Sequence, residues 1–157
     1  MNPSELQKMW KQSEIELLDL ATNEDVLSFQ NRTSLVFPDD LRDYFKEING
    51  TNEESEHSFF KFYSLNGFRS VKDEMSDWGG VPDYRNIINT MNFHSSCYVF
   101  SDYTCHLFTY CIRLYERKSS QNEVYIIAGD RFKLIANSFS EFLDLYSENS
   151  ETLYFSD

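Results

Sequence analysis

The segment CHLFTYCIRLYE, Cys105–Glu116, has the pattern of a β-strand that is apolar on both faces. Successive residues of a strand point to opposite faces of the sheet, so alternate positions can be compared. One face carries Phe108, Tyr110, Ile112 and Leu114, and the other carries Leu107, Thr109, Cys111 and Arg113. Because a strand with one solvated face alternates apolar and polar residues, this segment predicts a central strand of a sheet.

Shorter strands are expected on either side of this segment. CYVF, Cys97–Phe100, precedes it, and the four residues Ser101–Thr104 suit a hairpin connection. A second hairpin is predicted in NEVYIIAGDRFKLIA, Asn122–Ala136, with Gly129-Asp130 at the centre of a type II′ turn.

A further strand is predicted in SFFKFYS, Ser58–Ser64, with Phe60 and Phe62 on one face. It follows TNEESEH, Thr51–His57, which has the composition of a surface loop.

Three helices are expected, and FPDDLRDYFKEING, Phe37–Gly50, contains the middle one. Pro38 suits helix entry, Asp39 or Asp40 can accept a bond from a free amide, and Asn49-Gly50 can end the helix in a left-handed conformation. One apolar stripe faces the core and consists of Leu41, Tyr44, Phe45 and Ile48.

The opposite side of this helix is acidic at Asp40, Asp43 and Glu47. Asp43 and Glu47 repel each other four residues apart, and Glu47 lies near the negative end of the helix dipole. Two interpretations stay open: the stripe serves solubility, or it binds a basic partner.

The first helix is expected from Pro3 to about Leu20, with Asn2 as its cap. Its apolar face buries Trp10, whereas Ile15 falls on the opposite side, so Ile15 is exposed or the helix changes phase. The next segment, 22–36, reads as polar and irregular.

The last helix starts near Ser138, which forms a capping box with Glu141. Its apolar stripe consists of Phe139, Phe142, Leu143 and Tyr146. With no internal repeat and no second domain in view, we expect one domain over residues 1–157, with a core over about 3–147 and a tail at 148–157.

The composition bounds the function. The 157 residues include 26 acids and 14 bases, a net charge of −12, and most of the acid lies near the two ends of the sequence. Such a charge repels nucleic acid and anionic lipid and attracts a basic partner, so neither nucleic acid nor membrane is expected to bind. The opening segment is charged where a secretory signal is apolar, and no run approaches the length of a membrane span, so a cytoplasmic location is expected.

No catalytic or metal constellation is evident. The cysteines Cys97, Cys105 and Cys111 are odd in number, lack metal-ligand spacing, and are expected to be reduced and buried in strands. Cys105 and His106 are expected to point to opposite faces of a strand and so cannot form a dyad. No phosphate-binding, hydrolase or metalloprotease motif is present, so no cofactor, metal or enzyme activity is expected.

The stretch LNGFRSVKDEMSDWGGVPDYRNII, residues 65–88, is the most loop-rich part of the sequence, and a long functional loop with a recognition surface over Val71–Tyr84 is expected here. Within it, Asp73, Glu74, Asp77 and Trp78 are candidate partner-binding residues, because an exposed tryptophan among acids is typical of an interface anchor. The alternative is that Trp78 closes the core from a loop.

Three of these stretches together resemble the SUKH superfamily, which is named partly after the yeast Smi/Knr cell-wall assembly regulator. They are Phe37–Gly50, YVFSDYTCHLFTYCIRL at 98–114, and NEVYIIAGDRFKLIANSFSEFLDLY at 122–146. Typical of that family are the proline-started helix ending in Asn-Gly, a Phe-x-Asp hairpin at Phe100 and Asp102, and the terminal IANSFSEFL. Phe37 replaces the family's usual leucine before the proline.

The resemblance covers about Trp10 to Tyr146 and implies an α+β fold, with an antiparallel sheet of about six strands flanked by N-terminal, middle and C-terminal helices. It also implies a non-catalytic protein-binding module, most simply a bacterial immunity protein that neutralises a toxin, often a nuclease. The alternatives are a regulatory or scaffold protein of the Smi/Knr type and, less favoured, a small hydrolase. The family motifs do not locate a binding surface. The candidate partner-binding residues are therefore kept as a set from several segments: Asp102 and Tyr103 of the hairpin, Asp40, Asp43 and Glu47, and the Trp78 segment.

Overall fold

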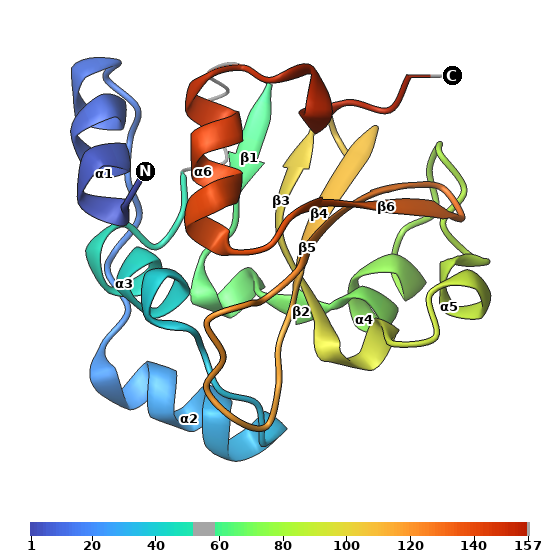
Figure 1. Ribbon diagram of the computed structural model, residues 1–157, viewed down its shortest axis with the longest axis horizontal. Coiled ribbons are helices and arrows are strands. Elements are labelled where there is room, and N and C mark those ends of the chain that lie inside the picture. Colours follow the sequence, from blue (N-terminus) through green and yellow to red (C-terminus); the bar gives the residue numbers. More distant parts are fainter. Residues whose placement is uncertain (52–58, 157) are drawn as a thin grey trace.

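The sheet of this protein is antiparallel and has six strands. The computed structural model describes residues 1–51 and 59–156 (Figure 1). The strands are β1 Phe60–Phe62, β2 Arg69–Ser70, β3 Cys97–Tyr103, β4 Phe108–Arg113, β5 Val124–Ala128 and β6 Arg131–Ala136. Their order is β1-β3-β4-β5-β6, and β2 pairs with another part of β3. The expected antiparallel sheet is confirmed.

Strand β4 lies in the interior of the sheet and is apolar on both faces, as predicted. It pairs with β3 along one side and β5 along the other. Tyr110 and Ile112 pack into one hydrophobic cluster, whereas Cys111 packs into a second cluster on the other face. Burial on both faces follows from the alternation of strand side chains and requires a covering layer on each side.

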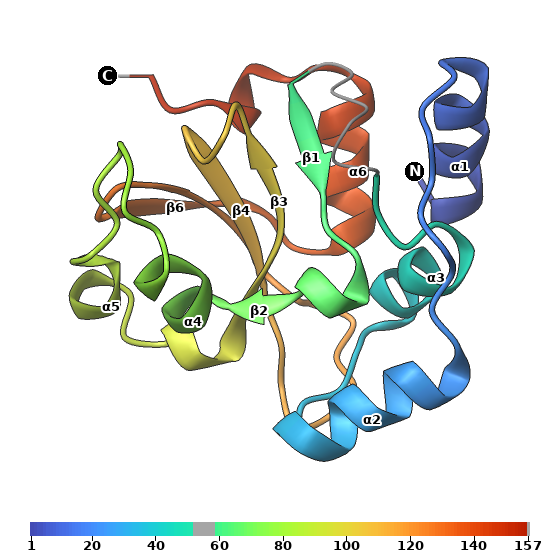
Figure 2. The same ribbon diagram turned by 180° about the vertical axis from the view of Figure 1, so that it is seen from behind.

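Two helical layers supply that cover, which makes the fold α+β with three layers (Figures 1 and 2). One layer contains α1 Pro3–Gln12, α2 Asn23–Thr33, α3 Asp39–Glu47 and α6 Phe139–Ser147, whose apolar residues belong to the first cluster. The other contains α4 Val71–Ser76 and α5 Ile87–Thr90, which pack on the second cluster. Short 3-10 turns occur at η1 Leu65–Gly67, η2 His94–Ser96 and η3 Glu151–Leu153.

Helix α3 forms as its sequence predicts. Leu41, Tyr44, Phe45 and Ile48 are all fully buried. Asn49 and Gly50 both have positive φ, 58° and 92°, and turn the chain out of the helix. The apolar stripe and the left-handed terminus therefore agree with the observed element.

The first helix is shorter than expected. Its capping box of Asn2 and Glu5 is present and Trp10 is buried, but the helix ends at Gln12 rather than near Leu20. Glu14 has a φ of 59°, and Leu17 then forms a β-bridge with Thr51. The position of Ile15 indicated this helix end, because in a continued helix the Ile15 side chain would point away from the core.

Residues 22–36, expected to be irregular, contain helix α2. Thr22 and Asp25 form a capping box at its start, and Val26 and Phe29 are its buried residues. Because only Val26 and Phe29 form the apolar stripe of α2, its sequence shows a weak helical period. The capping box of Thr22 and Asp25 was the one helix signal present in the sequence.

The connection between β3 and β4 also lies later than predicted. Strand β3 extends through Tyr103 because Phe60 of β1 pairs with it, and the turn spans 104–107 instead of 101–104. Thr104, Cys105 and His106 all have positive φ. Cys105 is therefore exposed in a turn, not buried in a strand, while Cys97 and Cys111 are buried as expected.

The long predicted loop is partly ordered into elements: η1, β2, α4 and α5 all lie within residues 65–90. Helix α4 starts because the Ser70 hydroxyl accepts the amide of Asp73. The β5–β6 turn at Gly129-Asp130 and the start of α6 at Ser138 are confirmed, although Glu141 reaches the amide of Asn137 instead of that of Ser138.

The residues after α6 continue the packing of the molecule, since Leu153 is buried and its carbonyl accepts the Tyr110 hydroxyl at 2.6 Å. Within residues 1–51 and 59–156, no helix combines the length and apolar character needed to cross a bilayer. The predicted acidic surface loop, with His57, lies outside the described residues apart from Thr51.

Candidate protein-binding surfaces

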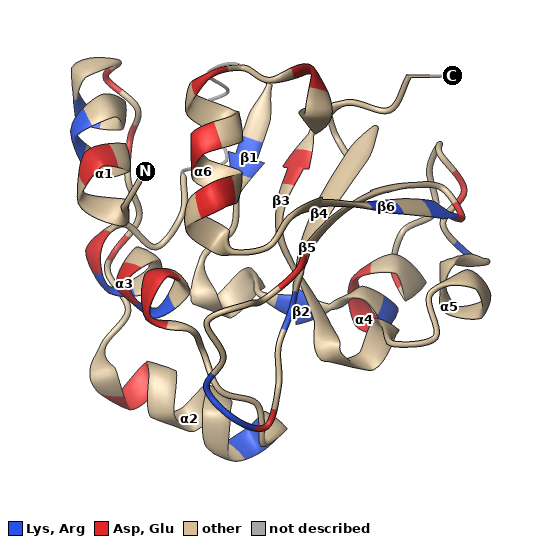
Figure 3. Ribbon diagram, viewed as in Figure 1, with Lys and Arg blue, Asp and Glu red and all other residues tan. Residues whose placement is uncertain are grey.

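The residues singled out from the sequence fall on two sides of the sheet. Asp73, Glu74, Asp77 and Trp78 lie in or directly after α4, and Asp102 reaches that side from β3. Asp40, Asp43 and Glu47 lie on α3 in the opposite layer, and the acidic residues of this helix are red in Figure 3. Tyr103 packs against the first hydrophobic cluster, beneath that layer. Asp102 and Tyr103 are separated because successive strand residues point to opposite faces. The candidates therefore do not form one continuous surface.

On the α4 side, a buried polar cluster joins three elements around His106. Asp102 is 4 % exposed and accepts the Tyr63 hydroxyl at 2.6 Å and the His106 amide at 3.2 Å. The His106 Nε2 lies 3.2 Å from both the Tyr63 hydroxyl and Glu74 Oε1. These bonds fasten the β3–β4 turn to helix α4 and to the residue that follows β1.

Trp78 covers this cluster. Its indole stacks on the His106 ring, with centroids 4.5 Å apart and planes 20° apart, and its Nε1–H donates to the Pro82 carbonyl at 2.9 Å. The Trp78 side chain is half-buried and also packs against the second hydrophobic cluster, beneath α4 and α5. Much of the ring area that an interface anchor would offer is thus already used within the fold.

The acids of α4 gather around one cation. Arg69 of β2 binds Asp77 at 2.7 Å and Glu74 at 3.5 Å, and it also donates to the carbonyl of Asp73. The hydrogen bond that Arg69 donates to Asp77, together with the nearby acids, raises the pKa of Arg69 above its usual value. The negative charge of this segment is therefore partly neutralised within the protein.

A hollow of about 300 Å³ opens beside the polar cluster around His106. Its lining includes the cations Lys61 and Arg69, the acid Glu74, and the side chains of Tyr63 and His106. Burial raises the pKa of Tyr63 far above its usual value, with Asp102 adding to the effect, so this hydroxyl serves as a hydrogen-bond donor. Because the lining carries both positive and negative charges, the hollow favours neither an anionic nor a cationic ligand. Among the described residues, no three His, Cys, Asp or Glu side chains are grouped to hold a metal ion.

On the other side of the sheet, the acidic stripe of α3 has partners inside the fold. Asp40 Oδ2 accepts the amide of Ser140 at 2.8 Å and its hydroxyl at 3.0 Å, and so caps the first turn of α6. Glu47 accepts the Ser4 hydroxyl of α1 at 2.8 Å. Asp43 pairs with Arg42 at 3.0 Å. The stripe holds α3 against its two neighbours, which explains in part why it is acidic.

Sequence reasoning missed Tyr63, Arg69 and His106 as a group. The argument that separated Cys105 from His106 assumed a strand, and it is wrong because both residues lie in a turn, with the imidazole facing Glu74 and Asp102. The two partners of the His106 Nε2 atom, Glu74 and Tyr63, lie 32 and 43 positions away in the chain. No local pattern could have joined them.

Comparison with known proteins agrees with the observed fold. No curated protein matches this sequence. The model of the SMI1/KNR4 family (SUKH-1) matches residues 20–145, a span that contains all six strands and the helices α2 to α5. That family groups generally non-catalytic, protein-binding modules of the immunity or Smi/Knr kind. Since the match covers far more than half of the sequence, the chain belongs to the SMI1/KNR4 family (SUKH-1).

Proposed function

We propose that this protein is an immunity-type module that acts in the cytoplasm and neutralises a cognate toxin domain by direct one-to-one docking. The toxin is a nuclease with a basic surface, because a surface that holds a phosphate backbone is rich in lysine and arginine. An acidic protein that docks there speeds its own encounter with the toxin and blocks the nucleic-acid substrate. The docking needs no covalent chemistry.

The observation that carries this proposal is the set of partners that the carboxylates of the α3 stripe have within the fold. Asp40 and Glu47 are held by the neutral groups of Ser140 and Ser4, which fix the direction of each carboxylate without cancelling its charge. Asp43, in contrast, shares a guanidinium with Asp39. In a protein of net charge −12, these oriented carboxylates support long-range attraction of a basic partner.

The first test is co-expression with the product of the neighbouring gene, if that gene encodes a toxin. The proposal expects protection of the cells, co-purification of the two proteins at a 1:1 ratio, and loss of nuclease activity in the complex. If the toxin still kills cells that make this protein and the two do not co-purify, the proposal is wrong for that pair. Binding to host proteins without any toxin would favour a regulatory scaffold instead.

The second test measures the association rate against salt. The rate should fall as the Debye length shrinks from about 10 Å at 0.1 M toward about 3 Å at 1 M. Glu47→Gln and the control Glu116→Gln each change the net charge from −12 to −11, and Glu116 is exposed in the β4–β5 connection. If Glu47→Gln associates more slowly than the control, the α3 stripe takes part in attracting the partner. Equal association rates would mean that only the total charge matters.

A further inference from the structure

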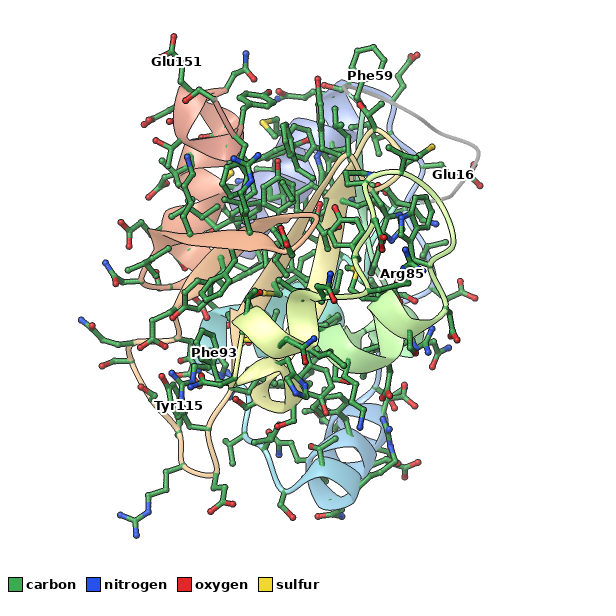
Figure 4. All side chains as sticks on the ribbon, turned by 90° about the vertical axis from the view of Figure 1, so that its right-hand side faces the viewer. Glu16, Phe59, Arg85, Phe93, Tyr115 and Glu151 are labelled. Carbon is green, nitrogen blue, oxygen red and sulfur yellow. The ribbon has the colours of Figure 1, made fainter. Side chains whose placement is uncertain are left out.

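An aromatic groove lies at the end of the molecule where α1 and α6 terminate. It has a volume of about 420 Å³ and is lined by Met9, Phe59, Phe60, Tyr103, Tyr146 and Tyr154, with Ser147 and Asn149 at its edge. Phe59 is 66 % exposed, although a phenylalanine is normally buried. Figure 4 labels Phe59 and Glu151 at this end.

The rings of the groove form a connected wall. Phe60 meets Tyr103 at 5.0 Å and Tyr146 at 5.2 Å between centroids, and Tyr103 meets Tyr154 at 5.3 Å. Phe59 extends the row, 6.2 Å from Tyr103. The planes of these pairs are inclined by 59° to 81°, so the rings surround the hollow from several directions. Aromatic walls of this kind receive cations, which are attracted to the negative faces of the rings.

Helix ends and exposed acids near the groove also favour a cation, although Lys133 of β6 already donates to the Tyr154 carbonyl at 3.3 Å. Helices α1 and α6 run in the same direction and both end here (Figure 1), so the negative ends of two helix dipoles are near the groove. Helix α6 has no basic residue in its last turn, although α1 has Lys11. Glu148 lies between two lining residues and is exposed, as is Glu151. Among the described residues that line the groove, none is charged.

We propose that this aromatic groove receives a lysine or arginine side chain of the basic protein partner. The inference rests on the proposed function for the identity of the partner and adds the place where that partner inserts a side chain. The aromatic faces contact the cation, while the helix ends and the exposed acids Glu148 and Glu151 compensate its charge. It also gives Tyr103 a role distinct from that of Asp102.

The test uses the isolated protein and two synthetic peptides, so it does not depend on a toxin. One peptide is a Gly-Ser chain with two arginines, and the other has citrulline, which has a similar shape but no charge, at those positions. Both are titrated into ¹⁵N-labelled protein and followed by NMR. The arginine peptide should shift the amide signals of Phe59, Phe60, Tyr103 and Tyr146, and the citrulline peptide should not.

A matched pair of variants locates the contact. Phe59→Leu keeps an apolar side chain but removes one aromatic face, and it should weaken arginine-peptide binding by about twofold to fivefold, as expected for one exposed cation–π contact. Phe132→Leu removes a ring from β6, outside the groove, and should leave the affinity unchanged.

Equal binding of the two peptides would show that the groove takes an uncharged side chain and would overturn the inference. Absence of binding, or shifts confined to the outer faces of α3 and α6, would overturn it as well, while the proposed function would still stand on the toxin experiments. If the arginine peptide binds in the groove but no toxin is neutralised, the proposed function fails and the groove assignment remains.

Discussion

The three cysteines are expected to differ in thiol reactivity because they differ in burial. Cys97 and Cys111 are buried, and burial together with the hydrogen bond that the Cys111 thiol donates to Cys97 raises the pKa of Cys111 well above its usual value. Cys105 is exposed in the β3–β4 turn. Titration with a thiol reagent should therefore find one reactive thiol in the native protein and three after unfolding. Cys105→Ser should abolish the native reaction; two or more fast thiols in the native protein would contradict the structure.

The Tyr63 hydroxyl is predicted to stabilise the His106 cluster. Tyr63→Phe removes the donor to Asp102 and leaves a buried carboxyl group short of one bond, which should lower the free energy of unfolding by about 1–3 kcal/mol. Urea unfolding followed by circular dichroism measures the change. The control is Tyr115→Phe, since Tyr115 also donates to an acid, Glu123, but from a partly buried position. A loss for Tyr63→Phe no larger than that for the control would mean that the buried cluster adds no extra stability.

At the scale of elements, the end of α3 depends on one glycine. Gly50 has a φ of 92°, and a Cβ built there would lie 2.7 Å from the Phe62 carbonyl oxygen. Gly50→Ala should therefore lower the free energy of unfolding by more than about 1 kcal/mol. Gly79→Ala is the control, because a Cβ at Gly79 meets nothing within 4 Å. Equal unfolding midpoints in urea for the two variants would contradict this account.

The elements that the sequence predicts well are those whose local signals agree. In α3 the apolar stripe and the Asn49-Gly50 end, and in α6 the Ser138 cap and the apolar stripe, indicate the helices that form. In α2 the cap was present but the stripe was narrow, and in α1 the stripe extended into residues that leave the helix. Helix predictions went wrong where these signals did not agree on one boundary.

At the scale of the whole molecule, buried tyrosines should make the fold sensitive to alkali. Burial raises the pKa of Tyr84 to about 12, against 10 for a free side chain, and it also raises the pKa of Tyr63 and Tyr110. Between pH 10 and 12 the folded state keeps protons that the unfolded state has lost, so stability is fully present below pH 10 and falls as the pH rises. Phenolate absorbance of the buried tyrosines should rise together with the loss of circular dichroism. Complete titration near pH 10 with intact dichroism would contradict this prediction.

The sequence by itself determined the central position of β4, the cores of α3 and α6, and the net charge. These properties depend on composition and on periods of two or 3.6 residues, which are local quantities. The resemblance to the SUKH superfamily was also readable from short stretches in order.

Only the tertiary structure decided which polar residues meet. It joined Tyr63, Glu74 and Asp102 around His106, separated Asp102 from Tyr103, and turned Asp40 into a cap for a helix 100 residues away. It also gathered Met9 of α1 and rings from β1, β3 and α6 into one groove. Contacts between distant segments depend on how strands pair and layers pack, and no local period in a sequence encodes that arrangement.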